Sequence, residues 1–278
     1  MWDSELARMN ENKKGRPYSF PDSFILVVGY MRTYLHLPYR QTEGIIKATG
    51  KSLQHHPSYG HICKRINNLK VDINSGIMTD GDGDDHLVIA IDSTGIKITN
   101  RGQWMSDKWG VGNKRKRRGY LKIHVAVNVK TREILALEIT DEKANDSRIM
   151  RKLVKHVLDK HDEKNPKIKS VLSDGAYDSN ENFRFPNGKR IKPAIKVKRN
   201  SVISSHSNKM RNREVGHQTK DFLKWKKKKK HGQRWIAETA FSSVKRMFGE
   251  HVSASSFRNM AKERVVKASL YNLFTRLA

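Results

Sequence analysis

The stretch RWIAETAFSSVKR, residues 234–246, places one acidic and two basic side chains at helical spacing. Glu238 follows Arg234 by four residues, and Lys245 follows Glu238 by seven. At 3.6 residues per turn the three side chains lie within about 40° of one another on a helix. The stretch therefore predicts a helix that presents a carboxylate framed by two cations.

The chain before this helix changes from helical patterns to β-strand patterns at about residue 86. The segments HLVIAID, GIKIT, YLKIHVAVNV and REILALEIT are rich in β-branched residues or alternate in polarity. Consecutive strands of this kind predict an antiparallel meander. A helix is expected over 144–161, followed by a strand in PKIKSVLSD and a fifth strand in GKRIKPAIKVK. These elements predict an α/β fold with a mixed sheet.

Two more acids stand where strands of this sheet are expected to end. Asp92 follows VIAI in the first strand, and Asp174 follows SVLS in the fourth. Together with Glu238 they form a set of carboxylates on separate elements, and hard oxygen ligands of this kind bind Mg²⁺. Two such ions activate the attacking oxygen and stabilise the leaving oxygen in phosphoryl transfer. A single acid in a strand-to-loop turn is more often ordinary surface charge, so the hypothesis depends on all three.

The composition is strongly basic, with a formal charge of +28 and a pI near 10.2. From residue 186 to the end, 24 Lys and Arg face 5 Asp and Glu, so this third supplies +19 of the total. An excess of this size predicts a polyanionic partner, and nucleic acid is the default. The run of lysines that includes Lys226, Lys228 and Lys230 is interpreted as a set of phosphate contacts. The alternatives are a solvated charge run and a protein that binds nucleic acid by charge alone.

The sequence offers no sign of export or membrane insertion. Its one cysteine, Cys63, allows no internal disulfide, and the first residues lack a basic segment followed by an apolar run. The longest apolar run, residues 24–31, is too short to cross a bilayer. We expect a cytoplasmic, nucleoid-associated protein without membrane contact.

Residues 1–80 are expected to form a separate helical region. A polar arm over 1–19 precedes three short helices, which begin near Pro21, Pro38 and Pro57. The last two resemble a helix-turn-helix, which favours DNA binding, although small helical bundles show the same pattern. SGIMTDGDGDD, residues 75–85, breaks the pattern and predicts a domain boundary. The second domain would then span 86–278 and contain a basic loop over 200–230.

The combination of IDSTGIK, SDGAYDS and the 234–246 stretch resembles the DDE transposases of bacterial and archaeal insertion sequences. The resemblance covers about 87–277, with a looser match in 18–69. The family's helical signature is Tyr, two residues, Arg, three residues, Glu, six residues, Lys. It falls on Arg234, Glu238 and Lys245, while His231 stands where the family often has Tyr.

This resemblance implies a ribonuclease H-like catalytic domain in which Asp92, Asp174 and Glu238 are catalytic and hold two Mg²⁺, with Mn²⁺ as a substitute. Arg234, Lys245 and His231 would then contact DNA. The implied reaction is cleavage at the ends of an element and transfer of the 3′-hydroxyl into target DNA. The implied partners are double-stranded DNA, as terminal inverted repeats and target, and further copies of the chain in a dimer or higher oligomer. A nuclease of the same fold and an inactive or domesticated DNA-binding derivative are the alternatives.

Overall fold

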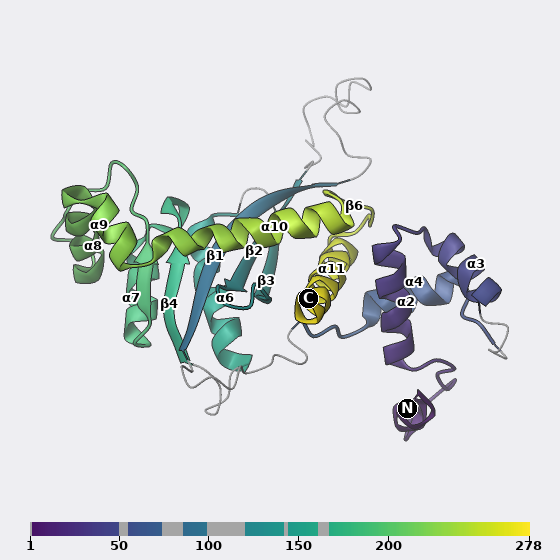
Figure 1. The fold of residues 1–278 in the computed structure, drawn as a ribbon. Coiled ribbons are helices and arrows are strands. Elements are labelled where there is room, and N and C mark those ends of the chain that lie inside the picture. The colour runs from purple at the N-terminus through teal and green to yellow at the C-terminus, as the bar shows by residue number, and fades with distance from the viewer. Residues whose placement is uncertain (1, 50–54, 74–85, 99–119, 142–143, 161–166) are drawn as a thin grey trace, which may run out of the picture.

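The computed structural model describes residues 2–49, 55–73, 86–98, 120–141, 144–160 and 167–278. The expected boundary at 75–85 lies outside these ranges. The described part contains a helical region built from the N-terminal residues and a sheet flanked by helices on both faces (Figure 1). Among the helices described, none is both long and apolar enough to cross a membrane.

The sheet has the strand order β3-β2-β1-β4-β5. β1 (His86–Ile98), β2 (Tyr120–Asn128) and β3 (Ile134–Asp141) form an antiparallel meander. β4 (Lys167–Ser173) and β5 (Lys192–Ile195) run parallel to β1. This mixed sheet, which is flanked by helices, confirms the predicted α/β fold class.

β1 differs from the expectation because HLVIAID and GIKIT, which were predicted as separate strands, form one continuous strand. Ser93, Thr94 and Gly95 interrupt the apolar pattern, yet all three pair with β2. On its other edge, β1 pairs with β4 up to Ala90, and Lys97 and Ile98 pair with the two-residue strand β6 (His251–Val252). Asp92 therefore lies within a long strand, at the point where β4 has ended.

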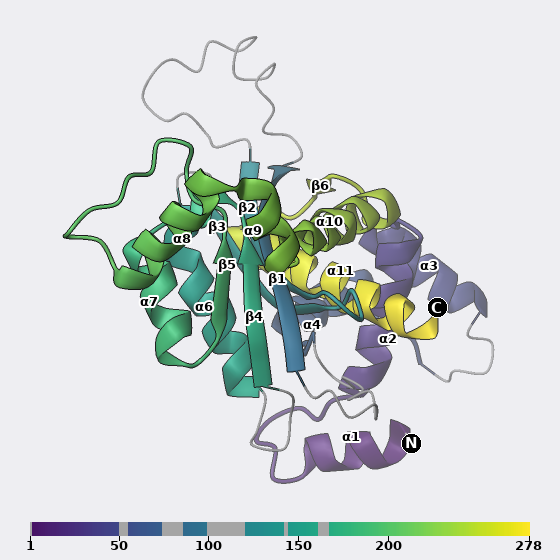
Figure 2. The ribbon, with the colours of Figure 1, turned by 60° about the vertical axis from the view of Figure 1, so that its left-hand side comes forward.

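Two apolar clusters pack on opposite faces of the sheet because side chains alternate along each strand. Leu87, Ile89 and Ile91 face α6 (Asp146–Lys160) and α7 (Asn180–Gly188). Ala90, Ile96 and Ile98 face the other side, where α10 (Trp235–Phe248) and α11 (Phe257–Leu277) pack. Figure 2 shows the two helical layers on either side of β1 and β4. Asp92 belongs to the second set by its parity, so it faces α10.

The helix α10 ends at a glycine that redirects the chain into β6. Gly249 has φ 78° and ψ 161°, a conformation that only glycine adopts readily. The chain returns at once to β1, where the Lys97 amide donates to the Glu250 carbonyl. This turn fixes α10 across the strands that carry the first two acids.

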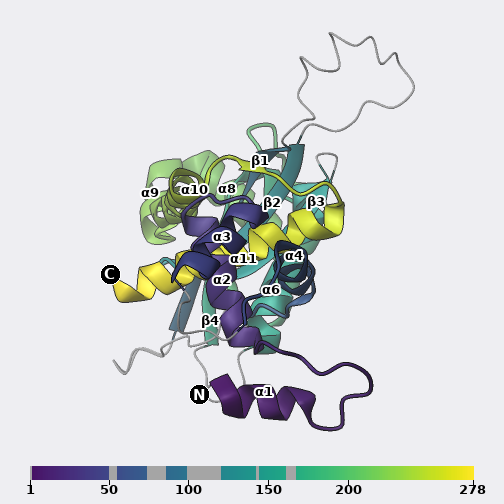
Figure 3. The same cartoon turned by 90° about the vertical axis from the view of Figure 1, so that its right-hand side faces the viewer.

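The N-terminal region contains four helices: α1 (Trp2–Asn10), α2 (Asp22–Tyr34), α3 (Tyr39–Thr49) and α4 (Tyr59–Asn68). The three expected helices are present, whereas α1 occupies part of the expected polar arm. Phe24, Ile25 and Ile62 form a small core that also includes Val266 of α11. Figure 3 shows α2 and α4 beside α11. The two regions therefore share packing through the last helix.

The expected basic loop over 200–230 is largely helical instead. It contains α8 (Lys209–Lys220) and α9 (Phe222–Lys228), which lie at the end of α10 that is remote from α11 (Figure 1). Only Val215 of α8 and Trp225 of α9 are buried apolar residues. Because so few apolar residues are buried in these two helices, the sequence shows no helical repeat of apolar residues there.

Candidate active site

The strand register brings Asp92 and Asp174 together. Ala90 of β1 is the Cα partner of Leu172 in the parallel strand β4. Each acid lies two residues beyond this pair, so both continue the same face of neighbouring strands. Parallel strands end at the same edge of a sheet. The fold therefore makes neighbours of two acids that are far apart in the sequence.

Asp92 is half-buried, with 14% of its side chain exposed. Burial raises its pKa, and the nearby Asp174 and Glu238 carboxylates raise it further. The Ser93 amide donates to Asp92 Oδ1 over 2.9 Å and, with Arg234, acts in the opposite direction. The Asp92 carboxylate is thus near enough to Asp174 and Glu238 to be repelled by both, which is a setting that favours a bound cation.

Arg234 supplies a positive charge to this acidic cluster. Its Nη1 lies 3.1 Å from Asp92 Oδ2, and its Nη2 contacts Glu238 Oε1. Arg234 therefore forms an i, i+4 ion pair with Glu238 and also pairs with Asp92. Arg234 is the residue before α10, in the short 3₁₀ helix His231–Arg234.

The donor set fits hard divalent cations because it consists of carboxylate oxygens from three elements. Among the described residues, however, no three His, Cys, Asp or Glu side chains are grouped tightly enough to hold a metal ion as they stand. Asp174 Oδ1 accepts from the Ala176 amide over 3.0 Å, and Arg234 separates Asp92 from Glu238. Metal binding would therefore require Arg234 to release at least one carboxylate.

Lys245 lies on the same face of α10 as Glu238 and points toward β1. Its Nζ donates to Thr94 Oγ1 over 3.0 Å. Thr94 is two residues beyond Asp92, so the contact continues the alignment of α10 along β1. The structure thus places Arg234, Glu238 and Lys245 along one stripe that faces the strand carrying Asp92.

His231 is buried and does not face solvent, which does not fit the direct DNA contact expected for it. Only 6% of the residue is exposed, and its ring lies 5.0 Å from the Trp225 ring. Nε2 lies 2.9 Å from the Ser173 carbonyl, so this nitrogen carries the proton and donates. Burial lowers the His231 pKa, which favours the neutral ring. His231 thus links the start of α10 to the residue before Asp174.

A second polar network supports His231 from the α8–α9 side. Glu214 is fully buried and accepts from Trp225 Nε1 over 2.6 Å and from Lys229 Nζ over 2.7 Å. One of the five consecutive lysines is therefore part of this structural network. Lys226, Lys228 and Lys230 are exposed. Sequence reasoning missed Glu214, and nothing in the local pattern distinguishes it from a surface acid.

A groove of about 850 Å³ opens beside Asp174, Arg234 and Glu238. The other charged residues of its lining are all basic: Lys196, Lys198, Arg199 and Lys226. Residues 196–198 were predicted as the end of the fifth strand, not as part of the site. Their position gives the acidic cluster a basic wall, which suits a phosphate backbone.

Asp178 holds that wall in place. It accepts from the Lys198 amide over 3.0 Å and from Ser201 Oγ over 2.7 Å. Arg211 of α8 binds both carboxylate oxygens, with distances of 2.7 and 3.0 Å. Burial alone would raise the Asp178 pKa, but these hydrogen bonds and the Arg211 charge lower it. The second Asp of SDGAYDS is therefore a structural clamp.

The sequence matches a family model described as "Transposase DDE domain" over residues 83–273. A second family model with the same description matches residues 1–101. The first match covers more than half of the chain and contains all three acids.

Three solved structures show a looser likeness. The piggyBac transposase synaptic complex with hairpin DNA has 10% identity and a TM-score of 0.43, with coverage of 98% of this chain and 70% of that chain. The Drosophila P element transposase strand transfer complex has 13% identity and a TM-score of 0.36, with coverage of 98% and 68%. The Mos1 strand transfer complex has 8% identity and a TM-score of 0.31, with coverage of 95% and 77%.

Proposed function

Because the chain belongs to the family of transposase DDE domains, we propose that it cuts DNA at the ends of an insertion sequence and joins the freed 3′-hydroxyl to target DNA. The observation that carries this proposal is the convergence of Asp92, Asp174 and Glu238 beside a basic groove. The three acids are the proposed catalytic residues. The partners are duplex DNA, as terminal inverted repeats and target, and at least one further copy of the chain to hold the second end.

The three carboxylates are proposed to hold two Mg²⁺, for which Mn²⁺ can substitute. The bound ions would activate the attacking water or hydroxyl and stabilise the leaving 3′ oxygen. The chain's own contribution is positional. Asp92 and Asp174 are fixed by the β1–β4 register, and Glu238 is fixed by α10. His231 helps to hold α10 against the end of β4 through the Ser173 carbonyl.

Arg234 is proposed to exchange partners during the reaction. Before DNA binds, it neutralises Asp92 and Glu238. A guanidinium released by these carboxylates is well suited to a bidentate phosphate contact. Lys245, Lys226 and the wall formed by Lys196, Lys198 and Arg199 would bind neighbouring phosphates as positive charges. Exposed Lys228 and Lys230 would add affinity without reading sequence.

The N-terminal region is proposed to bind the element ends. A groove of about 1040 Å³ runs beside α4 and the segment before it. Its charged lining is mostly basic, with Arg16, Lys64 and Arg65 against one acid, Asp22, and three histidines, His55, His56 and His61, add polar groups. Asp22 is paired with Arg65 over 2.6 Å. The unpaired part of this lining is positive and supports the DNA-binding assignment of residues 1–80.

The proposal is tested with the full chain, Mg²⁺ and a labelled duplex that carries the DNA flanking the coding region. Wild type should give nicked or cleaved ends and joined products, and chelation should abolish both. Glu238→Gln should bind the duplex but yield neither product. Glu250→Gln is the matched control, since Glu250 is exposed two residues beyond the same helix.

The products also separate the alternatives. Cleaved ends without joined products would indicate a nuclease of the same fold. Duplex binding that is identical in wild type and Glu238→Gln, with no metal-dependent product from either, would indicate a DNA-binding derivative and would contradict the proposal.

A further inference from the structure

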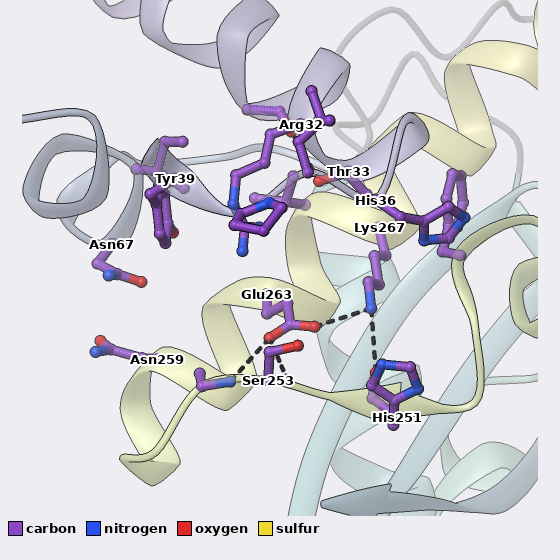
Figure 4. A pocket seen from close by; sticks show the side chains of 17 residues that line it. Arg32, Thr33, His36, Tyr39, Asn67, His251, Ser253, Asn259, Glu263 and Lys267 are labelled. Carbon is purple, nitrogen blue, oxygen red and sulfur yellow. Dashed lines mark hydrogen bonds and ion pairs between the residues drawn. The ribbon is translucent and has the colours of Figure 1, made fainter. Parts of the chain in front are cut away.

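A cavity of about 400 Å³ lies between the N-terminal helices and the end of the chain, away from the three acids. One side comes from the turn between α2 and α3 and from α4, and the other comes from β6 and the first half of α11. Figure 4 shows Arg32 and Lys267 among the side chains that line it. This cavity plays no part in the proposed phosphoryl transfer.

Arg32 is a cation without an acidic partner in the part of the chain that the structure describes. Its guanidinium lies 4.0 Å from the centre of the Tyr39 ring, which orients it over the cavity. Its Nε is buried and has no hydrogen-bond partner. A buried, unsatisfied N–H on a charged group is costly, which suggests that an acceptor from outside the chain completes this site.

Glu263 is the acid in the lining of this cavity, and both of its carboxylate oxygens already accept hydrogen bonds. Glu263 Oε2 accepts from the Ser253 and Ala254 amides over 3.0 and 3.2 Å. Its Oε1 accepts from Lys267 Nζ over 2.8 Å. Burial alone would raise the Glu263 pKa, but Lys267 and these hydrogen bonds lower it. Glu263 therefore balances Lys267 and leaves the charge of Arg32 uncompensated.

A third cation increases the local excess of positive charge. Arg264 is 2% exposed, and its Nη2 donates to the His251 carbonyl over 2.6 Å, the same carbonyl that Lys267 approaches at 3.2 Å. Burial, together with nearby Arg264 and Arg32, lowers the pKa of Lys267 to about 8 against the opposing effect of Glu263. Three cations and one acid at a buried interface favour an anion.

We propose that this cavity binds a phosphate group, with Arg32 as its main contact and Lys267 as its second. The fork of a guanidinium matches phosphate oxygens, and an ammonium adds a point charge. The phosphate is either part of a DNA backbone that passes between the N-terminal helices and α11, or a free phosphate ion. Either source would fasten the two regions together.

The first test is thermal unfolding in inorganic phosphate against chloride at equal ionic strength, for wild type, Arg32→Gln and Arg40→Gln. Arg40 is the matched control because it also stacks on a tyrosine, Tyr59 at 5.1 Å, but does not line the cavity. Phosphate at ten times its Kd should raise the wild-type Tm by about 3 °C. Arg40→Gln should show the same shift, and Arg32→Gln should lose most of it.

Arg32→Lys keeps the charge without the fork and should retain part of the shift. In chloride, Arg32→Gln and Arg40→Gln should have similar Tm values, because each loses a contact with a tyrosine ring. An equal phosphate shift in Arg32→Gln and Arg40→Gln would overturn the proposal. Thermal unfolding in phosphate needs neither metal nor DNA cleavage, so its result is independent of the catalytic proposal.

The second test identifies the source of the phosphate through the salt dependence of duplex binding. If a backbone phosphate occupies the cavity, Arg32→Gln should reduce the slope of log K against log salt by about one. If that slope is unchanged while the Tm shift is lost, the ligand is free phosphate.

Discussion

Asp92 and Asp178 are acids with little exposed side-chain surface, and their surroundings move their pKa values in opposite directions. Asp178 has no exposed side-chain surface, yet its pKa is lowered because Arg211, Ser201 and the Lys198 amide bind the charged form. Asp92 keeps 14% exposure, yet its pKa is raised by burial and by two neighbouring acids. Burial therefore does not determine the role of an acid here. The partners do, and the acid with too few partners belongs to the proposed active site.

Asp92→Asn is the strongest test of the difference between Asp92 and Asp178. This change removes a proposed metal ligand and relieves repulsion with Asp174 and Glu238. Cleavage should fall by about 10³-fold or more, since metal ions supply several kcal/mol of transition-state stabilisation. The Tm should stay the same or rise. Single-turnover cleavage and calorimetry measure the two effects, and a large drop in Tm would show that Asp92 is instead a structural residue.

Asp178→Asn should have the opposite outcome. Removing one partner of a buried ion pair lowers the free energy of unfolding by about 3 kcal/mol. Urea denaturation measures the loss. Glu181→Gln is the matched control, because its ion pair with Arg151 is exposed and the expected change is below about 1 kcal/mol. Equal stability of the two variants would refute the clamp.

Acid titration of stability sharpens the same contrast. Because the folded pKa of Asp178 is lowered, its stabilisation is fully present above the unfolded pKa of about 4. It is lost as the pH falls through the lower folded value. The free energy of unfolding measured from pH 6 to pH 2 should therefore fall less steeply in Asp178→Asn than in wild type. Parallel curves would contradict the assignment.

Arg234→Gln removes the cation that Asp92 and Glu238 share. Without this competitor, Mn²⁺ should bind the DNA-free protein more tightly, by up to about tenfold, as measured by calorimetry. Cleavage should nevertheless decrease, because the proposed phosphate contact is lost. Weaker Mn²⁺ binding would mean that Arg234 positions the carboxylates instead of competing for them.

The smallest effect is expected from single lysines at the groove. Lys226→Gln should weaken duplex binding a few-fold and reduce the salt slope by about one. Lys227 is the neighbouring control, as it is exposed but does not line the groove beside Asp174. Indistinguishable salt slopes for the two variants would place the DNA elsewhere.

Sequence reasoning predicted the parts of the molecule that obey a local period. The stripe of Arg234, Glu238 and Lys245 follows from helical spacing, and the strands that carry Asp92 and Asp174 follow from their β-branched residues. The three N-terminal helices were also found, because each begins near a proline and has apolar residues at regular intervals.

The parts that sequence reasoning missed depend on contacts between distant residues. β1 continues through Ser93 to Gly95 because β2 pairs with this polar stretch. His231 is buried because the Ser173 carbonyl and Trp225 surround it. The helix α8 is stabilised through Glu214, Gln218 and Arg211 instead of an apolar face. None of these partners is visible from the local pattern.

The last helix has a mechanical consequence. Val266 of α11 completes the core of the N-terminal helices, and Ser269 of α11 lies 2.6 Å from the Tyr30 hydroxyl of α2. The same helix packs on the sheet through Leu270 and Tyr271. A single rigid rod thus joins the proposed end-binding region to the proposed cutting site. The helix α11 would then set the distance along the DNA between the sequence bound by the N-terminal region and the phosphate that is cut.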